Sequence, residues 1–91
     1  MKTTFYVYIL LCKDNSYYTG YTNDLKNRIK KHKEGIASKY TRGKGFKELV
    51  YFETHPTKVS AMKREYAIKT QNKAYKSKLV SEFKKNSSQN I

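Results

Sequence analysis

The sequence is short of several residue types, and each shortage excludes a class of protein. A single cysteine, Cys12, rules out an internal disulfide and a cysteine-rich zinc site, and it indicates a reducing compartment. The longest apolar run, residues 5–12, is too short to span a bilayer or to form a typical signal sequence. Tryptophan is absent, and only 7 residues are acidic. We therefore expect a cytoplasmic protein that does not enter the membrane.

Basic residues, in contrast, are abundant. The chain has 20 lysines and arginines, and its formal net charge is +13. This charge favours a polyanionic partner through a large and salt-sensitive electrostatic term. A soluble surface without any partner is the simpler interpretation, and no segment has the basic face and large apolar anchors of a membrane-bound helix. Nucleic acid is the partner that the composition favours.

The length predicts one small domain. A chain of 91 residues without internal repeats buries roughly 60–65% of its unfolded surface. Nine tyrosines and four phenylalanines supply much of its apolar surface. Because a buried tyrosine hydroxyl needs a hydrogen-bond partner, some of these hydroxyls are candidates for chemistry.

The distribution of apolar and turn-forming residues predicts three strands. Residues 4–12 and 17–22 are rich in β-forming side chains and flank a turn signal at 14–16, which is typical of a hairpin. A third strand is predicted at 46–54. The predicted fold class is α/β (α+β), with a small three-stranded antiparallel sheet flanked by about three helices.

Three helices are predicted around these strands. The first covers about ten residues from Leu25 and is capped by Asn23 or Asp24. The second begins after Pro56 and runs for about fifteen residues. The third is a short helix over residues 73–83.

The remaining segments are expected to lack regular structure. Gly35 is a stop signal for the first helix. Residues 39–45 contain two glycines and three cations and are expected to form a mobile basic loop. The cations of this loop are candidate nucleic-acid contacts: Lys39, Arg42 and Lys44. Residues 84–91 are polar and rich in amides, so we expect them to be disordered and the single domain to cover residues 1–83.

The hairpin carries two tyrosine motifs, Tyr6-Val7-Tyr8 and Tyr18-Thr19-Gly20. If it turns around a three-residue loop centred on Asp14, Tyr8 lies opposite Gly20, and both motif tyrosines share one face. Gly20 would then leave open space beside the Tyr8 ring, where a strand backbone or a substrate phosphate could approach. A two-residue loop would place the tyrosines on opposite faces. The simpler alternative is that both rings only pack on the sheet.

Two polar side chains fall on the apolar side of the first predicted helix. At 100° per residue, His32 lies within the stripe of Leu25, Ile29 and Ile36, and Arg28 lies on its border. Aliphatic residues are expected at these positions, so the presence of a polar pair there suggests a specific role. A guanidinium suits phosphate binding, and an imidazole can relay a proton or orient a tyrosine hydroxyl. A hydrogen-bonded structural histidine is the alternative.

Glu65 is the one acidic residue of the second predicted helix. It borders the apolar arc of that helix, between Met62 on one side and Ala61 and Ile68 on the other. One carboxylate aimed at a phosphate site suits a loosely held Mg²⁺, which usually keeps several waters. The alternative is a surface salt bridge to Lys69, four residues further along.

The order and spacing of these side chains resemble those of the GIY-YIG nuclease domain, over about residues 5–83. On that resemblance Tyr8 and Tyr18 are the two motif tyrosines, Arg28 holds the scissile phosphate, and His32 stands where relatives place His or Tyr. Glu65 binds a single divalent ion, Mg²⁺ or Mn²⁺. Related enzymes use a tyrosine or tyrosinate to help deprotonate the attacking water, and the resemblance leaves open which tyrosine is the base.

A narrower similarity is to the small stand-alone bacterial proteins labelled UPF0213. It rests on His32, Gly35, Ala61, Glu65 and the segments 41–45 and 48–51. The same string is similar to the nuclease domain of the eukaryotic structure-specific endonuclease that cuts branched DNA.

The chain departs from the wider family in both tyrosine motifs and at one later position. The first motif reads Tyr-Val-Tyr instead of Gly-Ile-Tyr, and Thr19 replaces the usual isoleucine. Many members carry an asparagine about a dozen residues after the glutamate, where this chain has Ser77. Asn72 lies nearby, and whether it takes that role is open.

The resemblance implies a metal-dependent DNA endonuclease, acting on double-stranded or branched DNA in repair or recombination. Relatives usually gain their targeting from an attached domain or a protein partner. The alternative is a basic nucleic-acid-binding adaptor of the same fold with little or no turnover. The preference for DNA over RNA rests on the family alone.

Overall fold

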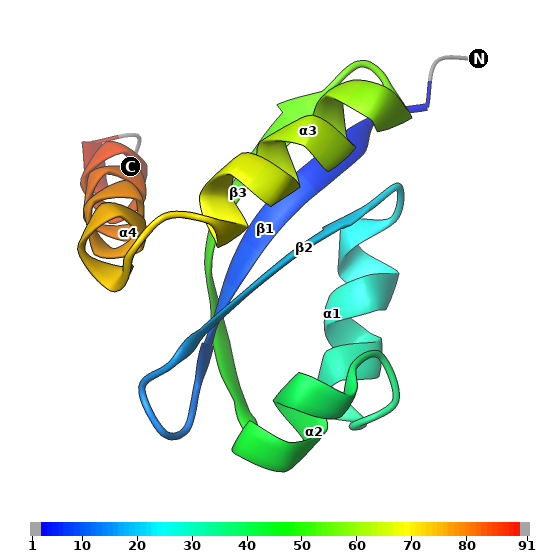
Figure 1. The fold of residues 1–91 in the computed structure, drawn as a ribbon, viewed down its shortest axis with the longest axis vertical. Helices are drawn as coiled ribbons and strands as arrows, with labels where there is room; N and C mark the ends of the chain where they lie inside the picture. The colour runs from blue at the N-terminus through cyan, green and yellow to red at the C-terminus, as the bar shows by residue number, and fades with distance from the viewer. Residues whose placement is uncertain (1–2, 90–91) are drawn as a thin grey trace.

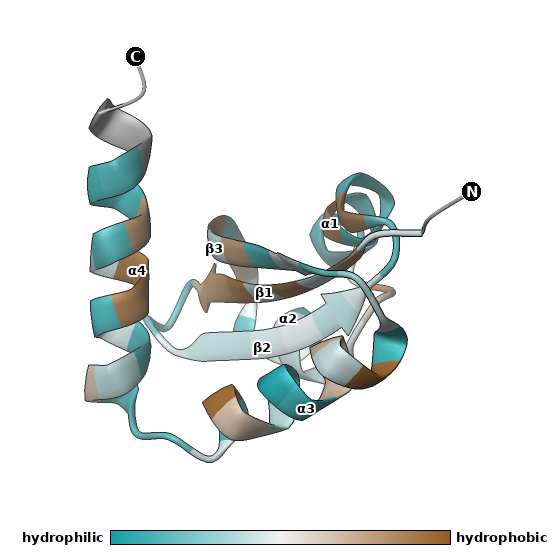
Figure 2. Cartoon of the chain, turned by 90° about the horizontal axis from the view of Figure 1, so that it is seen from above, coloured by the Kyte–Doolittle hydropathy of each residue, from teal (hydrophilic) through white to brown (hydrophobic). Residues whose placement is uncertain are grey.

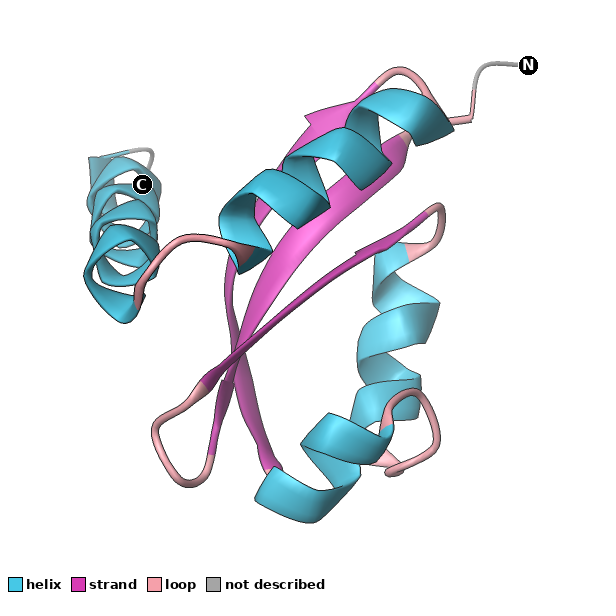
Figure 3. Ribbon diagram, in the orientation of Figure 1, coloured by secondary structure: helices cyan, strands magenta, loops and turns pink. Residues whose placement is uncertain are grey.

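The computed structural model describes residues 3–89, which form three strands and four helices (Figure 1). In chain order, the elements are β1 Phe5–Cys12, β2 Tyr17–Thr22, α1 Leu25–Lys33, α2 Lys39–Lys44, β3 Phe46–His55, α3 Lys58–Lys69 and α4 Lys73–Gln89. The strands form one antiparallel sheet in the order β2-β1-β3 (Figure 3). The predicted fold class is confirmed, with four helices in place of about three.

The two faces of the sheet are covered by different helices. Val7 and Ile9 of β1 point to one face, where they pack with Ala61 and Ile68 of α3 and Val80 of α4. Helices α1 and α2 lie on the second face of the sheet. Figure 2 shows α3 and α1 on opposite sides of the sheet. The apolar core therefore lies under α3 and α4, which leaves the second face free to hold polar side chains.

The predicted hairpin register is confirmed. Tyr8 pairs with Gly20 and Leu10 pairs with Tyr18. The connection consists of residues 13–16, in which Asp14 Oδ1 accepts the Ser16 N–H at 3.0 Å. This register puts Tyr8 and Tyr18 on the same face of the sheet, with ring centroids 6.4 Å apart.

Helix α1 begins and ends at the predicted signals. Asp24 is its N-cap, with its side chain accepting the Asn27 N–H at 3.2 Å. Gly35 follows the helix at φ 77°, and the next residue, Ile36, donates its N–H to the Lys31 carbonyl at 3.0 Å. This hydrogen bond and the left-handed glycine form a Schellman motif.

The predicted mobile loop at 39–45 is mostly helical, so that prediction is wrong. Residues Lys39–Lys44 form the short helix α2, which Ser38 caps by accepting the Tyr40 N–H at 3.1 Å. Gly45, at φ 84°, ends it. The two glycines suggested a loop, and Gly43 does cost about 1 kcal/mol of helical propensity. The Ser38 cap and the burial of Thr41 favour the helix against that cost.

The last two helices also differ in length from the prediction. Helix α3 has 12 residues rather than about fifteen and begins after the Thr57 cap. Helix α4 continues to Gln89, beyond the predicted end at residue 83 and into the segment expected to be disordered. Asn90 and Ile91 lie outside the described residues. Within residues 3–89, no helix is long and apolar enough to cross a membrane.

Candidate active site

A buried chain of hydrogen bonds connects three elements on the second face of the sheet. The Tyr8 hydroxyl of β1 lies 2.9 Å from Nε2 of His32 in α1. The other ring nitrogen of His32, Nδ1, lies 2.8 Å from Oγ1 of Thr41 in α2. Tyr8, His32 and Thr41 are each 1% exposed. The predicted placement of His32 on the buried side of α1 is thus confirmed, and its two partners are now defined.

Thr41 selects the tautomer of His32. The Thr41 hydroxyl donates to the Ser38 carbonyl, with 3.3 Å between the oxygens, because a carbonyl can only accept. The Thr41 oxygen therefore accepts the Nδ1–H of His32. In a neutral imidazole this leaves Nε2 unprotonated, so Tyr8 donates its hydroxyl proton to His32.

Burial holds both partners in their neutral forms. It lowers the pKa of His32 to about 4, and the charge of Arg28 adds to this effect. Burial also raises the pKa of the Tyr8 hydroxyl above its usual range, with further increases from Tyr18 and Glu65 and an opposing effect of Arg28. At pH 7 the resting site therefore contains a neutral phenol that donates to a neutral imidazole.

The depressed pKa of His32 predicts a loss of stability in acid. The unfolded state binds a proton near pH 6.5, whereas folded His32 does so only near 4. Stability should therefore fall as the pH drops from about 6.5 to about 4, by roughly 2–3 kcal/mol in total. Urea unfolding at several pH values should show this dependence in the wild type and a flatter one in His32→Gln. Equal slopes in the two proteins would contradict it.

Tyr18 lies beside this chain in a cluster of rings and one cation. Its ring centroid is 5.3 Å from that of His32 and 5.8 Å from that of Tyr40 in α2. The ammonium of Lys69 lies 5.9 Å from the Tyr18 ring centroid. Because Tyr18 is half-buried whereas Tyr8 is buried, Tyr18 is the motif tyrosine closer to solvent.

Gly20 has a different role from the one predicted. A Cβ atom at this position would lie 2.6 Å from the Tyr8 hydroxyl oxygen and 3.2 Å from the Tyr18 ring. The Tyr8 side chain itself therefore fills the expected open space. It can do so only because the residue paired with it on β2 has no side chain. A contact of Gly20 with nucleic acid stays a prediction.

Arg28 sits at the edge of the buried chain, where it influences both Tyr8 and His32. It also lines a shallow cleft of about 420 Å³ together with Thr22 and Lys58. Two cations at one cleft suit a phosphate group. Lys58 was not identified from the sequence, where it was one of many lysines.

Glu65 lies close enough to Tyr8 for its charge to raise the Tyr8 pKa. Its side chain is 19% exposed, and one of its oxygens lies 3.7 Å from Lys69 Nζ, as the salt-bridge alternative predicted. Among residues 3–89, no group of three or more His, Cys, Asp or Glu side chains could hold a metal ion. A single carboxylate nevertheless fits Mg²⁺, which takes one or two protein carboxylates and completes its shell with water and phosphate oxygens.

The basic residues of α2 lie outside this cluster. Arg42 and Lys39 are exposed, and Lys44 pairs with Asp14 at 3.3 Å. Asn72 and Ser77, the residue at the position of the family asparagine, both make contacts outside this cluster. Asn72 accepts the Tyr75 N–H at 3.0 Å at the start of α4, and the Ser77 hydroxyl lies 3.3 Å from that of Tyr17.

A second polar network attaches α3 to β3. Glu53 binds the guanidinium of Arg64 through both carboxylate oxygens, each 3.1 Å from Nε, and also bonds to His55 and Tyr51. Burial alone would raise the pKa of Glu53, but these hydrogen bonds outweigh it and lower that pKa. Since Arg64 precedes Glu65, this network fixes the helix that carries the candidate metal ligand.

Comparison with known proteins identifies relatives that cover most of the folded region. The family model of the GIY-YIG catalytic domain matches residues 4–79. A UPF0213 protein of Clostridium perfringens is 54% identical over 76 residues, which are 84% of this chain and 82% of the relative.

Two solution NMR structures are similar in fold as well. A UPF0213 protein from Bacillus halodurans is 52% identical, with a TM-score of 0.55, over 86% of this chain and 83% of that one. A protein from E. faecalis is 33% identical, with a TM-score of 0.60, over 91% of each chain. The chain therefore belongs to the GIY-YIG catalytic domain family and, within it, to the UPF0213 proteins.

Proposed function

We propose that this chain is a metal-dependent DNA endonuclease that hydrolyses phosphodiester bonds. The observation that carries the proposal is the buried Tyr8 hydroxyl, which donates to an unprotonated His32 Nε2. A phenol held in this way can pass its own proton to His32 while its oxygen accepts a proton from an attacking water. The membership in a catalytic domain family supports the same conclusion.

Tyr8 is the general base in this mechanism, and His32 is the residue that receives its proton. As a water attacks phosphorus, the water proton passes to the Tyr8 oxygen while the Tyr8 proton moves towards His32 Nε2. The imidazolium that forms keeps its Nδ1–H on Thr41, which holds the ring in place. Tyr18 packs against His32 and forms the solvent side of the site.

Arg28 binds the scissile phosphate from the adjoining cleft, with Lys58 as a second cation. Its guanidinium can also stabilise the charge that develops on phosphorus. Glu65 would hold the divalent ion, Mg²⁺ or Mn²⁺. When bound, that ion would offset the Glu65 charge that helps to raise the Tyr8 pKa, and it would withdraw electrons from the phosphate.

DNA is the proposed substrate, either double-stranded or branched. The net charge of +13 provides non-specific affinity, and the exposed cations of α2 add to it. Structure-selective cleavage in repair or recombination belongs to the same proposal and rests on the resemblance to branched-DNA endonucleases. A protein partner that supplies targeting would add to this affinity.

The test is cleavage of labelled linear, nicked, flapped and four-way branched DNA with Mg²⁺ or Mn²⁺. Metal-dependent cutting by the wild type is expected, and the preferred substrate among the four defines the selectivity. Binding to all four DNAs without any cutting would overturn the enzyme proposal. It would instead support the basic adaptor, for which the salt bridge between Glu65 and Lys69 is the favouring observation.

Substitutions in α2 are expected to weaken DNA binding without removing cleavage. Arg42→Gln and Lys44→Gln each remove a cation that is exposed and outside the buried site. The slope of log K against log salt should become shallower by about 0.9 for each phosphate contact that is lost. DNA titrations by fluorescence anisotropy at several salt concentrations measure the slope. An unchanged slope would place the DNA on another surface.

A further inference from the structure

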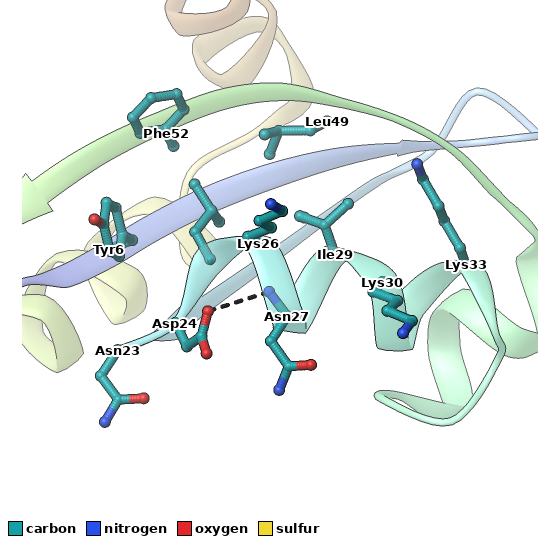
Figure 4. Close-up of a pocket in the computed structure, with 11 residues that line it drawn as sticks. Tyr6, Asn23, Asp24, Lys26, Asn27, Ile29, Lys30, Lys33, Leu49 and Phe52 are labelled. Carbon is teal, nitrogen blue, oxygen red and sulfur yellow. Dashed lines mark hydrogen bonds between the residues drawn. The ribbon is translucent and has the colours of Figure 1, made fainter.

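An open groove of about 1020 Å³ runs between α1 and β3, and Asn23 is the one lining residue that it shares with the Arg28 cleft. Five half-buried apolar side chains form its floor: Tyr6, Leu25, Ile29, Leu49 and Phe52. Figure 4 shows Ile29 of α1 pointing towards Leu49 of β3, with Tyr6 and Phe52 on the sheet side. Without a ligand, this apolar floor stays in contact with water.

Three lysines form one edge of this α1–β3 groove. Lys26, Lys30 and Lys33 recur at helical spacing, so they form a stripe about 10 Å long on α1. Lys26 and Lys33 extend from the helix towards β3 (Figure 4). The single acid of the lining is Asp24, whose carboxylate already accepts the Asn27 N–H. The groove therefore combines an apolar floor with an edge where positive charge exceeds negative charge.

The groove and the active site lie on opposite flanks of α1. At 100° per residue, the three lysines lie about 140–160° around the helix from Arg28. His32 faces Tyr8 and the second face of the sheet, with Arg28 beside them, whereas Lys26 and Lys33 extend towards β3 (Figure 4). A DNA phosphate at Arg28 therefore leaves the groove free.

We propose that the α1–β3 groove binds an acidic amphipathic peptide segment of a partner protein. Apolar side chains of such a segment would cover the floor, and its carboxylates would pair with the lysine stripe. A second copy of this chain, with net charge +13, would bring repulsion to that edge. A DNA backbone would satisfy the lysines but leave the apolar floor exposed. The proposal does not depend on nuclease activity.

The experiment uses the full chain and a fluorescein-labelled helical peptide of about 16 residues. This peptide carries leucine and phenylalanine on one face and glutamate along the border. Two control peptides replace either the glutamates with glutamine or the leucines and phenylalanines with serine. Binding by anisotropy is expected for the acidic amphipathic peptide and at least about tenfold weaker for both controls. Amide shifts in NMR spectra are expected along α1 and the facing part of β3.

Two charge-reversal variants separate this site from general electrostatics. The variant Lys26→Glu, Lys30→Glu, Lys33→Glu should bind the peptide at least about tenfold more weakly. The matched control reverses three exposed lysines of α3 and α4: Lys63→Glu, Lys78→Glu, Lys85→Glu. Equal weakening in the control would overturn the proposal, as would the absence of binding at about 1 mM peptide. Displacement of the peptide by duplex DNA would assign the groove to DNA instead.

Discussion

Replacing Glu65 with glutamine should abolish metal-dependent cleavage while leaving DNA binding nearly intact. Glutamine keeps the size and hydrogen bonding of the side chain but removes the one carboxylate that faces Tyr8. Without that charge the protein cannot hold a divalent ion against water, since Mg²⁺ needs at least one carboxylate here. We expect the rate at saturating DNA to fall by at least about 10²–10³-fold. Single-turnover cleavage and anisotropy, measured on the same preparation, separate the two effects.

Lys69→Gln is the control that distinguishes a metal ligand from a salt bridge. If Glu65 serves only to pair with Lys69, whose Nζ lies 3.7 Å away, removing either partner should have a similar small effect. If Glu65 holds a metal, Lys69→Gln should retain cleavage, and the metal concentration needed for half-maximal rate should not rise. Full activity in Glu65→Gln would remove the metal-site assignment.

The sequence predicted those parts of the site that follow from local periodicity. The pairing of Tyr8 with Gly20 followed from the position of the turn, because the turn sets the register of all residue pairs in a hairpin. The burial of His32 followed from its place beside Leu25 and Ile29 on the helical wheel, whereas Ile36, the third apolar residue of that stripe, lies beyond the end of α1 and is 68% exposed. Both features depend on residues that are close together in the sequence.

The parts that were missed depend on contacts between distant elements. Thr41 reaches His32 only because α2 folds back on α1, and nothing in a six-residue helix with two nearby glycines indicates that contact. Ser38 was an available signal, since a serine before such a segment is a common N-cap. Lys58 was one lysine among many, and Lys69 was named only as a possible salt-bridge partner of Glu65. Only the tertiary fold places them beside Arg28 and Tyr18.

The error at Gly20 has a similar cause. A glycine opposite an aromatic ring indicates a close approach, but the pattern alone does not say which atoms approach. The Tyr8 ring turns across β2 because its hydroxyl is held by His32 on the next layer. The identity of the approaching group therefore depended on α1, which the strand pattern does not contain.

Tyr8→Phe is expected to reduce cleavage by about 10²–10⁴-fold, the usual contribution of a positioned acid or base. The ring would remain between Gly20 and His32, but no hydroxyl would be left to take the water proton and pass one to Nε2. Tyr18→Phe should have a smaller effect, because the structure shows Tyr18 packed by its ring against His32 and Tyr40. Single-turnover rates of both variants, with substrate at saturation, test this order.

The Tyr8→Phe result needs a check for a purely structural loss. Removing the hydroxyl leaves the buried Nε2 of His32 without a donor, which should cost about 1–3 kcal/mol of stability. Tyr17→Phe is a matched control, because it also removes a hydrogen-bonded hydroxyl, here one that lies near Ser77 of α4. Thr41→Val tests the tautomer, since loss of its hydroxyl should shift the pH dependence of the rate while DNA binding stays unchanged. If Tyr8→Phe cleaves at the wild-type rate while folded, Tyr8 is a packing residue and the base must be sought elsewhere.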